Sequence, residues 1–414
     1  MFMQTGDSEE TILIVGGGFT GMMCALRLTQ LHPGRKIVMF DKSAQVGGMY
    51  GSLLYSENIS FDHGMHVIYE SCNLEVDNLY REVMPETEWN IYDGNEKDIA
   101  GLFFNGKLQT YSHYVDLRSF SPKLKKRLFG SFLENLQTFQ FKNPRSAVDF
   151  LKNQFGAEVM ETIHRPILEM MYGVDLEDLD IFATKATALD RIILFDPTIM
   201  EDLMQSSILR ARLAYADQLN LPPFRKNNQK ALYPKRFGMN NFIKRLKDNL
   251  EARGVEIFTQ TDISHISLNK DMIGEVTLTN NQLGKHSLKV DRMLWTAGWP
   301  SLAKQLGINI SDLSFQRGPE IIVINLVFDR PIDADRLYYF YCYDEGFATF
   351  RVTNYVNYCP DASRDGRFPI CIELWPSKIG KRREDITEDE YLPLVMDELR
   401  RFGVITEKHQ LLFS

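Results

Sequence analysis

Cysteine is scarce in this chain, and the few cysteines form no pattern. Five are spread over 414 residues, at positions 24, 72, 342, 359 and 371, without any Cys-x-x-Cys pair. This odd, scattered set fits neither a disulfide framework nor a zinc site, and it favours free thiols in a reducing, cytoplasmic environment. The eight histidines add no metal site, because His63 and His66 stand close together but no third ligand accompanies them.

Long apolar runs and an excess of positive charge are also absent. No stretch reaches the roughly 18 consecutive apolar residues of a membrane-spanning helix. The acidic start, MFMQTGDSEE, lacks the features of a signal peptide. The formal net charge of -8 disfavours a nucleic-acid-binding protein. Two basic stretches, residues 121–129 and 381–383, are more typical of solvated surface.

The remaining composition is that of an ordinary globular protein. Hydrophobic residues make up 44% of the chain and charged residues 25%. A chain of 414 residues is too long for one compact core, so two or three domains are expected.

Glycine is concentrated near the N-terminus, in the stretch TILIVGGGFTGMMCALRLTQ (residues 11–30). Residues 12–15 predict a buried parallel strand, and residues 22–31 predict a helix. The Gly-x-Gly-x-x-Gly turn between them would bring backbone N–H groups and the positive end of a helix dipole close to a pyrophosphate. The residues predicted to bind the cofactor in this turn are Gly16, Gly18, Phe19, Thr20 and Gly21.

An acidic residue follows at the spacing that a dinucleotide site requires. A second predicted strand, residues 36–40, ends at Asp41, which lies 20 residues after Gly21. A carboxylate in this place accepts hydrogen bonds from the hydroxyl groups of an adenosine ribose. The sequence therefore predicts a dinucleotide site, with a β-α-β unit that binds no dinucleotide as the alternative.

A second glycine cluster, Val46-Gly47-Gly48-Met49-Tyr50-Gly51, follows where an NAD-binding domain normally continues to another helix. This arrangement resembles the FAD enzymes related to glutathione reductase, in the branch of flavin amine oxidases, protoporphyrinogen oxidase and UDP-galactopyranose mutase. The resemblance implies FAD as the cofactor and flavin-dependent enzyme activity. It also implies cofactor contacts by Lys42, Gly47, Gly48 and Met49, although many relatives carry arginine at the position of Met49.

The next stretch, FDHGMHVIYE (residues 61–70), resembles the flavin-proximal loop of UDP-galactopyranose mutase, which has a Gly-x-His motif. The resemblance implies cofactor contacts by Gly64, Met65 and His66, and it makes His66 a candidate catalytic residue. A structural histidine in a loop is the alternative.

Residues 76–225 lack the strand–glycine rhythm and predict a mainly helical cap domain. The expected helices cover residues 124–141, 147–155, 158–171 and 199–219. Within them, HRPILEMMYGVDLEDLD (residues 164–180) resembles the cap-domain signature of the same family, for which we expect a packing role.

From Tyr233 onward the pattern returns to the nucleotide-domain type. A helix is expected over residues 239–253, followed by a β-meander over residues 263–290 and the segment MLWTAGWP, residues 293–300. The resemblance implies that backbone near the dinucleotide comes from Ile263, Thr296, Ala297 and Gly298.

The last third of the chain predicts a mixed or antiparallel sheet, with strands over residues 321–328, 338–343 and 348–352. The segment FRVTNYVNY (residues 350–358) resembles the mutase segment whose arginine pairs with a sugar-nucleotide diphosphate. Arg351 is therefore the second candidate catalytic residue. The polar residues that follow this arginine in the mutase are replaced here, so an ordinary aromatic sheet face is the alternative.

The expected fold is α/β: a Rossmann-like, glutathione reductase-like FAD-binding domain with a helical cap and a mixed or antiparallel sheet substrate domain. The predicted boundaries are 1–75 with 226–310 for FAD binding, 76–225 for the cap and 311–414 for the substrate domain. The glycine-rich segment that closes relatives of this family, their last FAD contact, is expected to be missing.

The predicted function is that of an FAD-dependent oxidoreductase acting on a small molecule, with a sugar-linked substrate of glycan or surface polysaccharide biosynthesis preferred. One alternative is UDP-galactopyranose mutase itself, which uses reduced flavin for ring contraction on a nucleotide sugar. Another is a non-catalytic or truncated flavin-binding protein. No metal, nucleic-acid partner or transmembrane segment is expected, and the oligomeric state is open.

Overall fold

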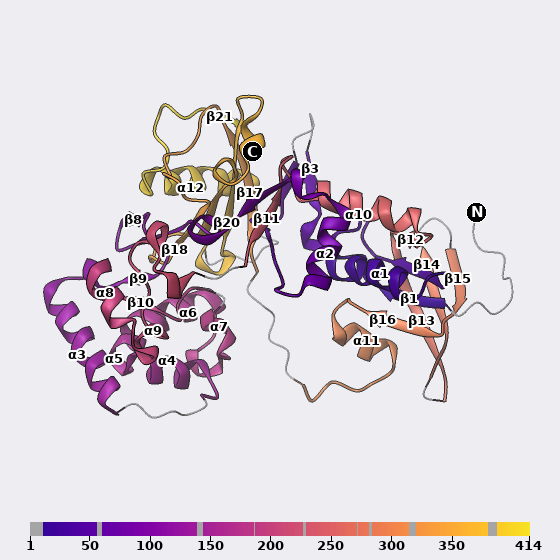
Figure 1. Cartoon of the computed structure of the whole chain (residues 1–414), viewed down its shortest axis with the longest axis horizontal. Helices are drawn as coiled ribbons and strands as arrows, with labels where there is room; N and C mark the ends of the chain where they lie inside the picture. Colours follow the sequence, from indigo (N-terminus) through magenta and orange to yellow (C-terminus); the bar gives the residue numbers. More distant parts are fainter. Residues whose placement is uncertain are drawn as a thin grey trace. The chain divides into compact units, whose positions relative to one another are not determined.

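The computed structural model describes residues 11–55, 60–138, 144–185, 187–226, 229–270, 272–280, 284–313, 320–379 and 387–414 (Figure 1). The acidic start and the basic residues 381–383, from which predictions were drawn above, lie outside these ranges, as does the end of the helix predicted over residues 124–141. Within them, no helix combines the length and the apolar character needed to cross a membrane. The chain forms two compact units, and each is described by itself.

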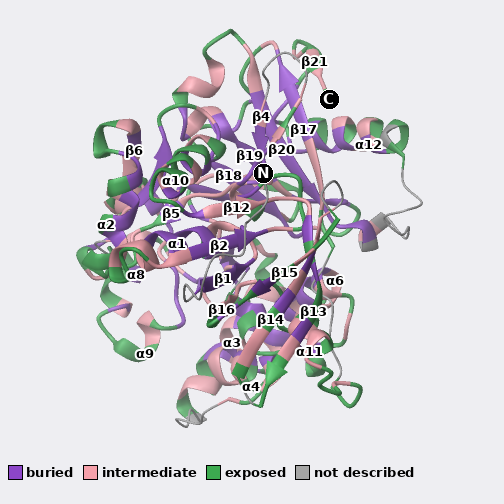
Figure 2. Ribbon diagram, turned by 90° about the vertical axis from the view of Figure 1, so that its right-hand side faces the viewer, coloured by how far each residue is buried: buried purple, intermediate pink, exposed green. Residues whose placement is uncertain are grey.

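The first unit, Met1–Ile91 and Leu232–Gln316, is built on a four-stranded sheet. All its neighbouring strands are parallel. Every residue of the first strand is buried, as the apolar run at residues 12–15 predicts for most of it (Figure 2). The strand order is β12 (Glu256–Phe258), β2 (Lys36–Phe40), β1 (Thr11–Val15) and β16 (Arg292–Trp295).

Both faces of this sheet are covered. Alternate residues of β1 and β2, including Leu13 and Phe40, share a core with a three-stranded antiparallel sheet. That sheet consists of β13 (Thr261–Asn269), β14 (Met272–Asn280) and β15 (Gly284–Lys289). Helix α1 (Phe19–Leu31) packs on β1 and β2 and contacts α2 (Leu74–Val83) and α10 (Asn240–Ala252). Helix α11 (Trp299–Gln305) contacts β13.

Short strands complete the first unit. β3 (Ser52–Leu54) and β4 (Ser60–Asp62) form an antiparallel pair. β5 (Ile68–Tyr69), β11 (Ala231–Pro234) and β6 (Trp89–Tyr92) form a three-stranded sheet at the place where the chain leaves and re-enters this unit.

The second unit, Tyr92–Ala231 and Arg317–Ser414, is built on a seven-stranded mixed sheet. The pairing of β18 with β7 is parallel, and the other described pairings are antiparallel. Its order is β21 (Leu411–Phe413), β17 (Ile322–Phe328), β20 (Phe368–Leu374), β19 (Thr349–Asn354), β18 (Tyr339–Cys342), β7 (Ala100–Phe104) and β8 (Lys107–Gln109). Helix α12 (Glu388–Arg401) is tied to this sheet by buried Glu398, which accepts hydrogen bonds from the amides of Ala348 and Thr349.

The helices of the second unit lie mostly between β9 (Val115–Asp116) and β11. They are α3 (Pro122–Thr138), α4 (Ala147–Phe155), α5 (Ala157–Val159), α6 (Arg165–Tyr172), α7 (Phe182–Lys185), α8 (Pro197–Leu203) and α9 (Ser207–Arg210), with one π-helical turn at Met160–His164 before α6 and a short strand, β10 (Ile192–Ile193). Residues of the predicted cap region and of the predicted substrate domain contribute to this one unit, and the predicted boundaries stay predictions.

One predicted helix is wrong. The continuous helix expected over residues 199–219 is replaced by the short helices α8 and α9. The Ser206 hydroxyl accepts a hydrogen bond from the Leu209 amide, so a new helix begins there. The chain then turns extended, and the Ala214 amide donates to the Ile192 carbonyl. Apolar spacing alone did not show this side-chain cap.

Candidate dinucleotide-binding site

The first glycine turn leaves the carboxyl end of β1 and leads directly into α1. A methyl group on Gly21 would lie 2.0 Å from the Gly16 carbonyl oxygen, so the turn closes only with glycine there. Gly18 starts the helix without any side-chain cap, and a methyl group on it would meet no atom within 4 Å. The N-terminus of α1 therefore has no side-chain cap and has free space beside Gly18, as an anion-binding helix N-terminus requires.

Thr296, at the end of the neighbouring strand β16, holds this turn in place. Its hydroxyl donates to the carbonyl oxygens of Val15 at 2.9 Å and Gly16 at 3.0 Å, and its amide donates to Val15 at 2.8 Å. Gly16 has φ of +102°, and a methyl group on it would lie 2.7 Å from the Thr296 hydroxyl. The following residues, Ala297 and Gly298, lead into α11.

Asp41 lies at the carboxyl end of β2, next to the glycine turn. Its Oδ2 accepts a hydrogen bond from the Gly17 amide at 2.8 Å, and its Oδ1 accepts one from the Ser43 amide at 2.7 Å. A carboxylate has about four acceptor positions, so the ribose hydroxyls of a dinucleotide could still donate to it. The neighbouring Lys42 is exposed.

The second glycine cluster runs beside the first. The Gly47 amide donates to the Gly17 carbonyl at 2.7 Å, and Gly47 forms an isolated parallel bridge with Gly18. Gly47 has φ of +112°, and a methyl group on Gly48 would lie 3.2 Å from the α-carbon of Gly18. Two bare backbone segments thus lie side by side at the end of the parallel sheet. Met49 in this cluster is 60% exposed.

Aromatic side chains connect the glycine clusters to His66. The Phe19 ring stacks on the Tyr50 ring at a centroid distance of 4.5 Å, and Tyr50 meets the His66 imidazole edge-on at 5.4 Å. The Nδ1 atom of His66 lies 3.3 Å from the carbonyl oxygen of Gly64. Sequence reasoning did not single out Tyr50, although its place directly after the second glycine pair is the signal that could have found it.

A buried carboxylate, that of Asp62, joins β3, β11 and the start of α10 by hydrogen bonds. Asp62, at the end of β4, accepts hydrogen bonds from the Tyr233 hydroxyl at 2.6 Å, the Met239 amide at 2.9 Å and the Ser52 hydroxyl at 2.9 Å. Burial raises the pKa of Asp62 to about 6, against the effect of these donors. Asp62 and Ser52 serve as the cap of α10, although both are far from that helix in sequence. Sequence motifs gave no signal for this network.

Ile263 lies in β13, and its side chain belongs to the core behind the parallel sheet. Its carbonyl accepts a hydrogen bond from Gln305 Nε2, and its amide donates one to Oδ1 of Asp262. Residues that precede Ile263 in sequence lie beside the end of β2. The Gln260 amide donates to the Ser43 carbonyl, and the Thr261 amide donates to the Asp41 carbonyl.

Arg351 lies in the second unit, on β19. Its Nε and Nη2 atoms donate to Oε1 of Glu373 on β20 at 2.9 and 2.5 Å, and its guanidinium lies 5.6 Å from the centre of the Tyr339 ring. Burial alone lowers the pKa of Arg351, but the Glu373 carboxylate and the nearby tyrosines raise it overall. The predicted substrate arginine is thus half of an ion pair, and sequence reasoning missed Glu373, an isolated charge in an apolar strand.

Among the described residues, no group of three or more His, Cys, Asp or Glu side chains is placed to hold a metal ion. His63, the extra histidine beside the Gly-x-His motif, is half-buried, and burial lowers its pKa.

Parallel strands that end in paired glycine turns define the first unit as a Rossmann-like domain. The family model of the NAD(P)-binding Rossmann-like domain matches residues 14–83. Together with the second unit of helices and a mixed sheet, the chain has the fold seen in solved structures of UDP-galactopyranose mutase, of a protein assigned as a protoporphyrinogen oxidase, and of putrescine oxidase. The predicted fold class is confirmed, and so is the predicted superfamily resemblance.

Solved structures agree over nearly the whole chain. The structure of reduced UDP-galactopyranose mutase matches with a TM-score of 0.71 and 16% identity, over 98% of this chain and 80% of that one. A structure assigned as a protoporphyrinogen oxidase from an Exiguobacterium species matches with a TM-score of 0.67 and 17% identity, over 99% of this chain and 86% of that one.

A curated relative is similar over part of its length. Coproporphyrinogen III oxidase of Staphylococcus aureus is 23% identical over 274 residues, which are 62% of this chain and 55% of the relative. The match therefore spans about half of that enzyme.

Proposed function

We propose that this chain binds FAD and acts as an FAD-dependent oxidoreductase on a small polar substrate. The observation that carries the proposal is the pair of adjoining glycine turns, Gly16–Gly21 and Gly47–Gly51, beside an uncapped helix N-terminus. When bound, FAD supplies two-electron redox chemistry. The chain's own residues would bind and orient it: amides of the first turn hold the pyrophosphate, Asp41 holds the ribose, and Tyr50 and His66 line the path toward the flavin.

Gly18 offers a test that separates cofactor binding from folding. Because a methyl group on Gly18 meets nothing within 4 Å, Gly18→Ala should leave the free energy of unfolding within about 0.5 kcal/mol of wild type. The same methyl group would occupy the space proposed for the pyrophosphate. We therefore expect FAD affinity, measured by calorimetry, to fall by at least about tenfold.

Gly21→Ala is the matched contrast, since its methyl group would lie 2.0 Å from the Gly16 carbonyl oxygen. This variant should lose stability as well as FAD. If wild-type protein shows no flavin absorbance and binds no FAD, or if Gly18→Ala binds it unchanged, the proposed cofactor site is refuted. Stoichiometric FAD that no donor can reduce would instead indicate a non-catalytic flavoprotein.

For the substrate, a sugar-linked molecule is our preferred class. The support is a polar, aromatic face of the seven-stranded sheet, where Tyr339 and Tyr341 on β18 lie beside the Arg351–Glu373 pair. Aromatic rings with hydroxyl groups and a paired guanidinium suit a hydroxyl-rich ring. The sugar assignment is tested by mixing the protein with candidate sugar-linked donors in the absence of oxygen. Reduction of the flavin is measured as the loss of its visible absorbance. No reduction by any of them would reject the sugar assignment and leave FAD binding untouched.

UDP-galactopyranose mutase activity is the second candidate, favoured by the TM-score of 0.71 and by the Gly64-Met65-His66 loop. Against it, the Arg351 guanidinium already pairs with Glu373, so a diphosphate would have to compete with a buried carboxylate. Dithionite-reduced protein incubated with UDP-galactopyranose decides the matter. Formation of the furanose would establish the mutase, and its absence would leave the oxidoreductase.

A further inference from the structure

The second unit contains a cavity of about 190 Å³ with a strongly positive lining. Among the described residues, its charged side chains are four cations and one carboxylate: Lys97, Arg191, Arg225, Lys226 and Asp98. The cavity is lined by the segment before β7, the loop between β8 and β9, Arg191 directly before β10, and the segment after α9. We call it the Arg191 cavity.

Several buried polar atoms of this lining have no hydrogen-bond partner in the described part of the chain. Two of these atoms are donors, the Nε atoms of Arg191 and Arg225. A third, Nδ1 of His113, is a donor in the tautomer that carries its hydrogen there. Two are acceptors, Oδ1 of Asn95 and Oδ1 of Asp98. Since buried polar groups in folded proteins are almost always satisfied, this set indicates a ligand that accepts from the donors and donates to the acceptors.

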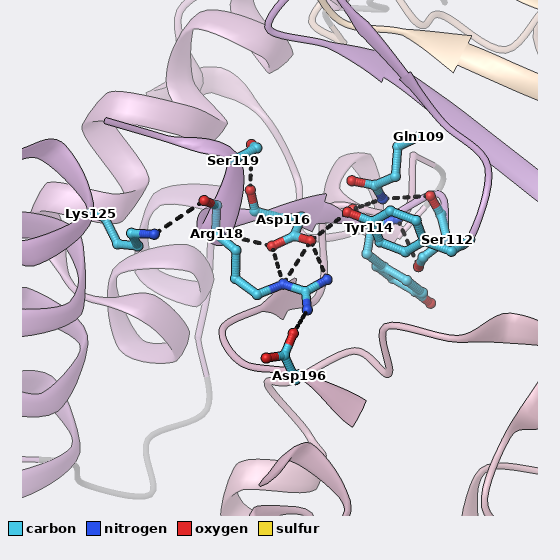
Figure 3. Close-up of polar contacts among 9 residues, drawn as sticks. Gln109, Ser112, Tyr114, Asp116, Arg118, Ser119, Lys125 and Asp196 are labelled. Carbon is cyan, nitrogen blue, oxygen red and sulfur yellow. Dashed lines mark hydrogen bonds and ion pairs between the residues drawn. The ribbon is translucent and has the colours of Figure 1, made fainter. Parts of the chain in front are cut away.

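The loop that carries His113 is held from both sides. Gln109 Nε2 donates to the carbonyls of Ser112 at 2.6 Å and Tyr114 at 2.9 Å, as Figure 3 shows. From the other side, Gln218 Nε2 donates to the Thr110 carbonyl at 2.7 Å. The orientation of this part of the lining is therefore fixed by packing and hydrogen bonds before any ligand arrives, which is what specific binding of a small molecule requires.

The two arginines are also held near each other. Arg191 Nη1 donates to the Tyr114 hydroxyl at 3.1 Å, while Arg225 Nη2 donates to the carbonyls of Arg210 and Leu213. Burial, and then the positive charge of Arg191, lower the pKa of Arg225 to about 10. An anion between these guanidinium groups would relieve their repulsion and could accept from both Nε atoms.

We propose that the Arg191 cavity binds the anionic group of a small metabolite, a phosphate or carboxylate with a neighbouring hydroxyl or amine. The anion accepts from Arg191, Arg225 and His113, and the neighbouring hydrogen-bond donor reaches Asn95 or Asp98. At about 30 Å³ per water molecule, the cavity holds roughly six waters, or a compact ligand of similar volume. Because the cavity lies wholly in the second unit, this proposal stands independently of FAD binding in the first.

Calorimetry on the full chain with defined probes tests the proposal. The probes are glycerol 3-phosphate, glycerate, inorganic phosphate and, as the neutral control, glycerol. We expect glycerol 3-phosphate or glycerate to bind at least about tenfold more tightly than glycerol. Binding of glycerol 3-phosphate indicates recognition of a phosphate, and binding of glycerate indicates recognition of a carboxylate. Inorganic phosphate should bind more weakly than glycerol 3-phosphate if the neighbouring hydroxyl is used. No binding of glycerol 3-phosphate and none of glycerate would overturn the proposal and leave a water-filled cavity.

Arg191→Met should lower the affinity for the probe that binds wild type by at least about tenfold. Its matched control is Arg364→Met, at an exposed arginine of the same unit, which should leave the affinity unchanged. If Arg191→Met does not fold, Lys226→Met decides, because this residue is exposed at the cavity rim. At low salt, Lys226→Met should weaken binding several-fold. Unchanged affinity in every variant that folds would place the probe elsewhere and overturn the proposal.

Discussion

Asp62→Asn should remove a pH-dependent loss of stability from the first, Rossmann-like unit. Burial raises the pKa of this carboxyl group from 3.8 to about 6, although Tyr233, Met239 and Ser52 all donate hydrogen bonds to it. Because the folded state favours the protonated form, its contribution to stability is fully present below pH 4 or so and is lost as the pH rises through about 6. At about 1.4 kcal/mol per pH unit, the gap between these two pKa values amounts to about 3 kcal/mol.

The expected result is a difference between wild type and variant that changes with pH. Relative to Asp62→Asn, wild type should lose about 3 kcal/mol of unfolding free energy between pH 4 and pH 7. Since the chain has two units, the readout must report on one of them. Hydrogen exchange in urea, followed on peptides that cover residues 231–252, reports on β11 and α10, which Asp62 connects.

Ser52→Ala is the matched control, because it removes one donor that favours the charged carboxylate. It should move the loss of stability to higher pH and leave its sign unchanged. A flat difference between wild type and Asp62→Asn across this pH range would refute the reasoning. It would mean that the three hydrogen bonds outweigh burial and keep Asp62 ionised in the folded protein.

Two further predictions concern buried charge in the second unit. Glu373→Ala should cost roughly 3–5 kcal/mol in urea unfolding, because it leaves the Arg351 side chain, only 19% exposed, without its carboxylate partner. Changing both residues to Met should recover most of that loss, and a cost below about 1 kcal/mol would contradict a strong ion pair in this partly buried place. His164 is fully buried, and burial lowers its pKa to about 4, so the neutral form is favoured and stability should be lost as the pH falls from 6.5 toward 4. His164→Gln should abolish that loss in thermal unfolding at pH 4.5 and 7, and an equal acid sensitivity in both proteins would refute this assignment.

Much of the first unit could be predicted from sequence because its signals are local. The run Ile12–Val15, the glycine spacing and Asp41 each determine a strand, a turn or a strand end by their own chemistry. The second glycine cluster was predicted from resemblance, and the hydrogen bond from Gly47 to Gly17 now gives it a physical reason. The contribution of each predicted residue to cofactor binding stays a prediction.

Contacts between distant segments could not be predicted in the same way. Asp62 caps α10 across 177 residues of sequence, and Glu373 meets Arg351 across 22. Each depends on strand pairing that no local pattern contains. The failure at residues 199–219 has this cause in part, since Ala214 pairs with Ile192 instead of continuing a helix, and the local Ser206 cap that begins α9 is the other part.

The charges around Arg351 and around the Arg191 cavity differ, and the difference favours the Arg191 cavity as the place where the second unit binds an anion. Resemblance pointed to Arg351, but its charge is balanced by Glu373, so an arriving anion gains only what remains after breaking or sharing that pair. In the lining of the Arg191 cavity the cations outnumber the carboxylate, and the Nε atoms of Arg191 and Arg225 have no hydrogen-bond partner among the described residues. Anion binding there relieves the repulsion between Arg191 and Arg225 and leaves the Arg351–Glu373 pair intact, although the anion would share Arg191 with Asp190, whose Oδ2 lies 3.8 Å from Nη2 of Arg191. An Arg351→Met variant should therefore leave glycerol 3-phosphate or glycerate binding intact, whereas Arg191→Met should not, and the opposite result would restore Arg351 as the anion site.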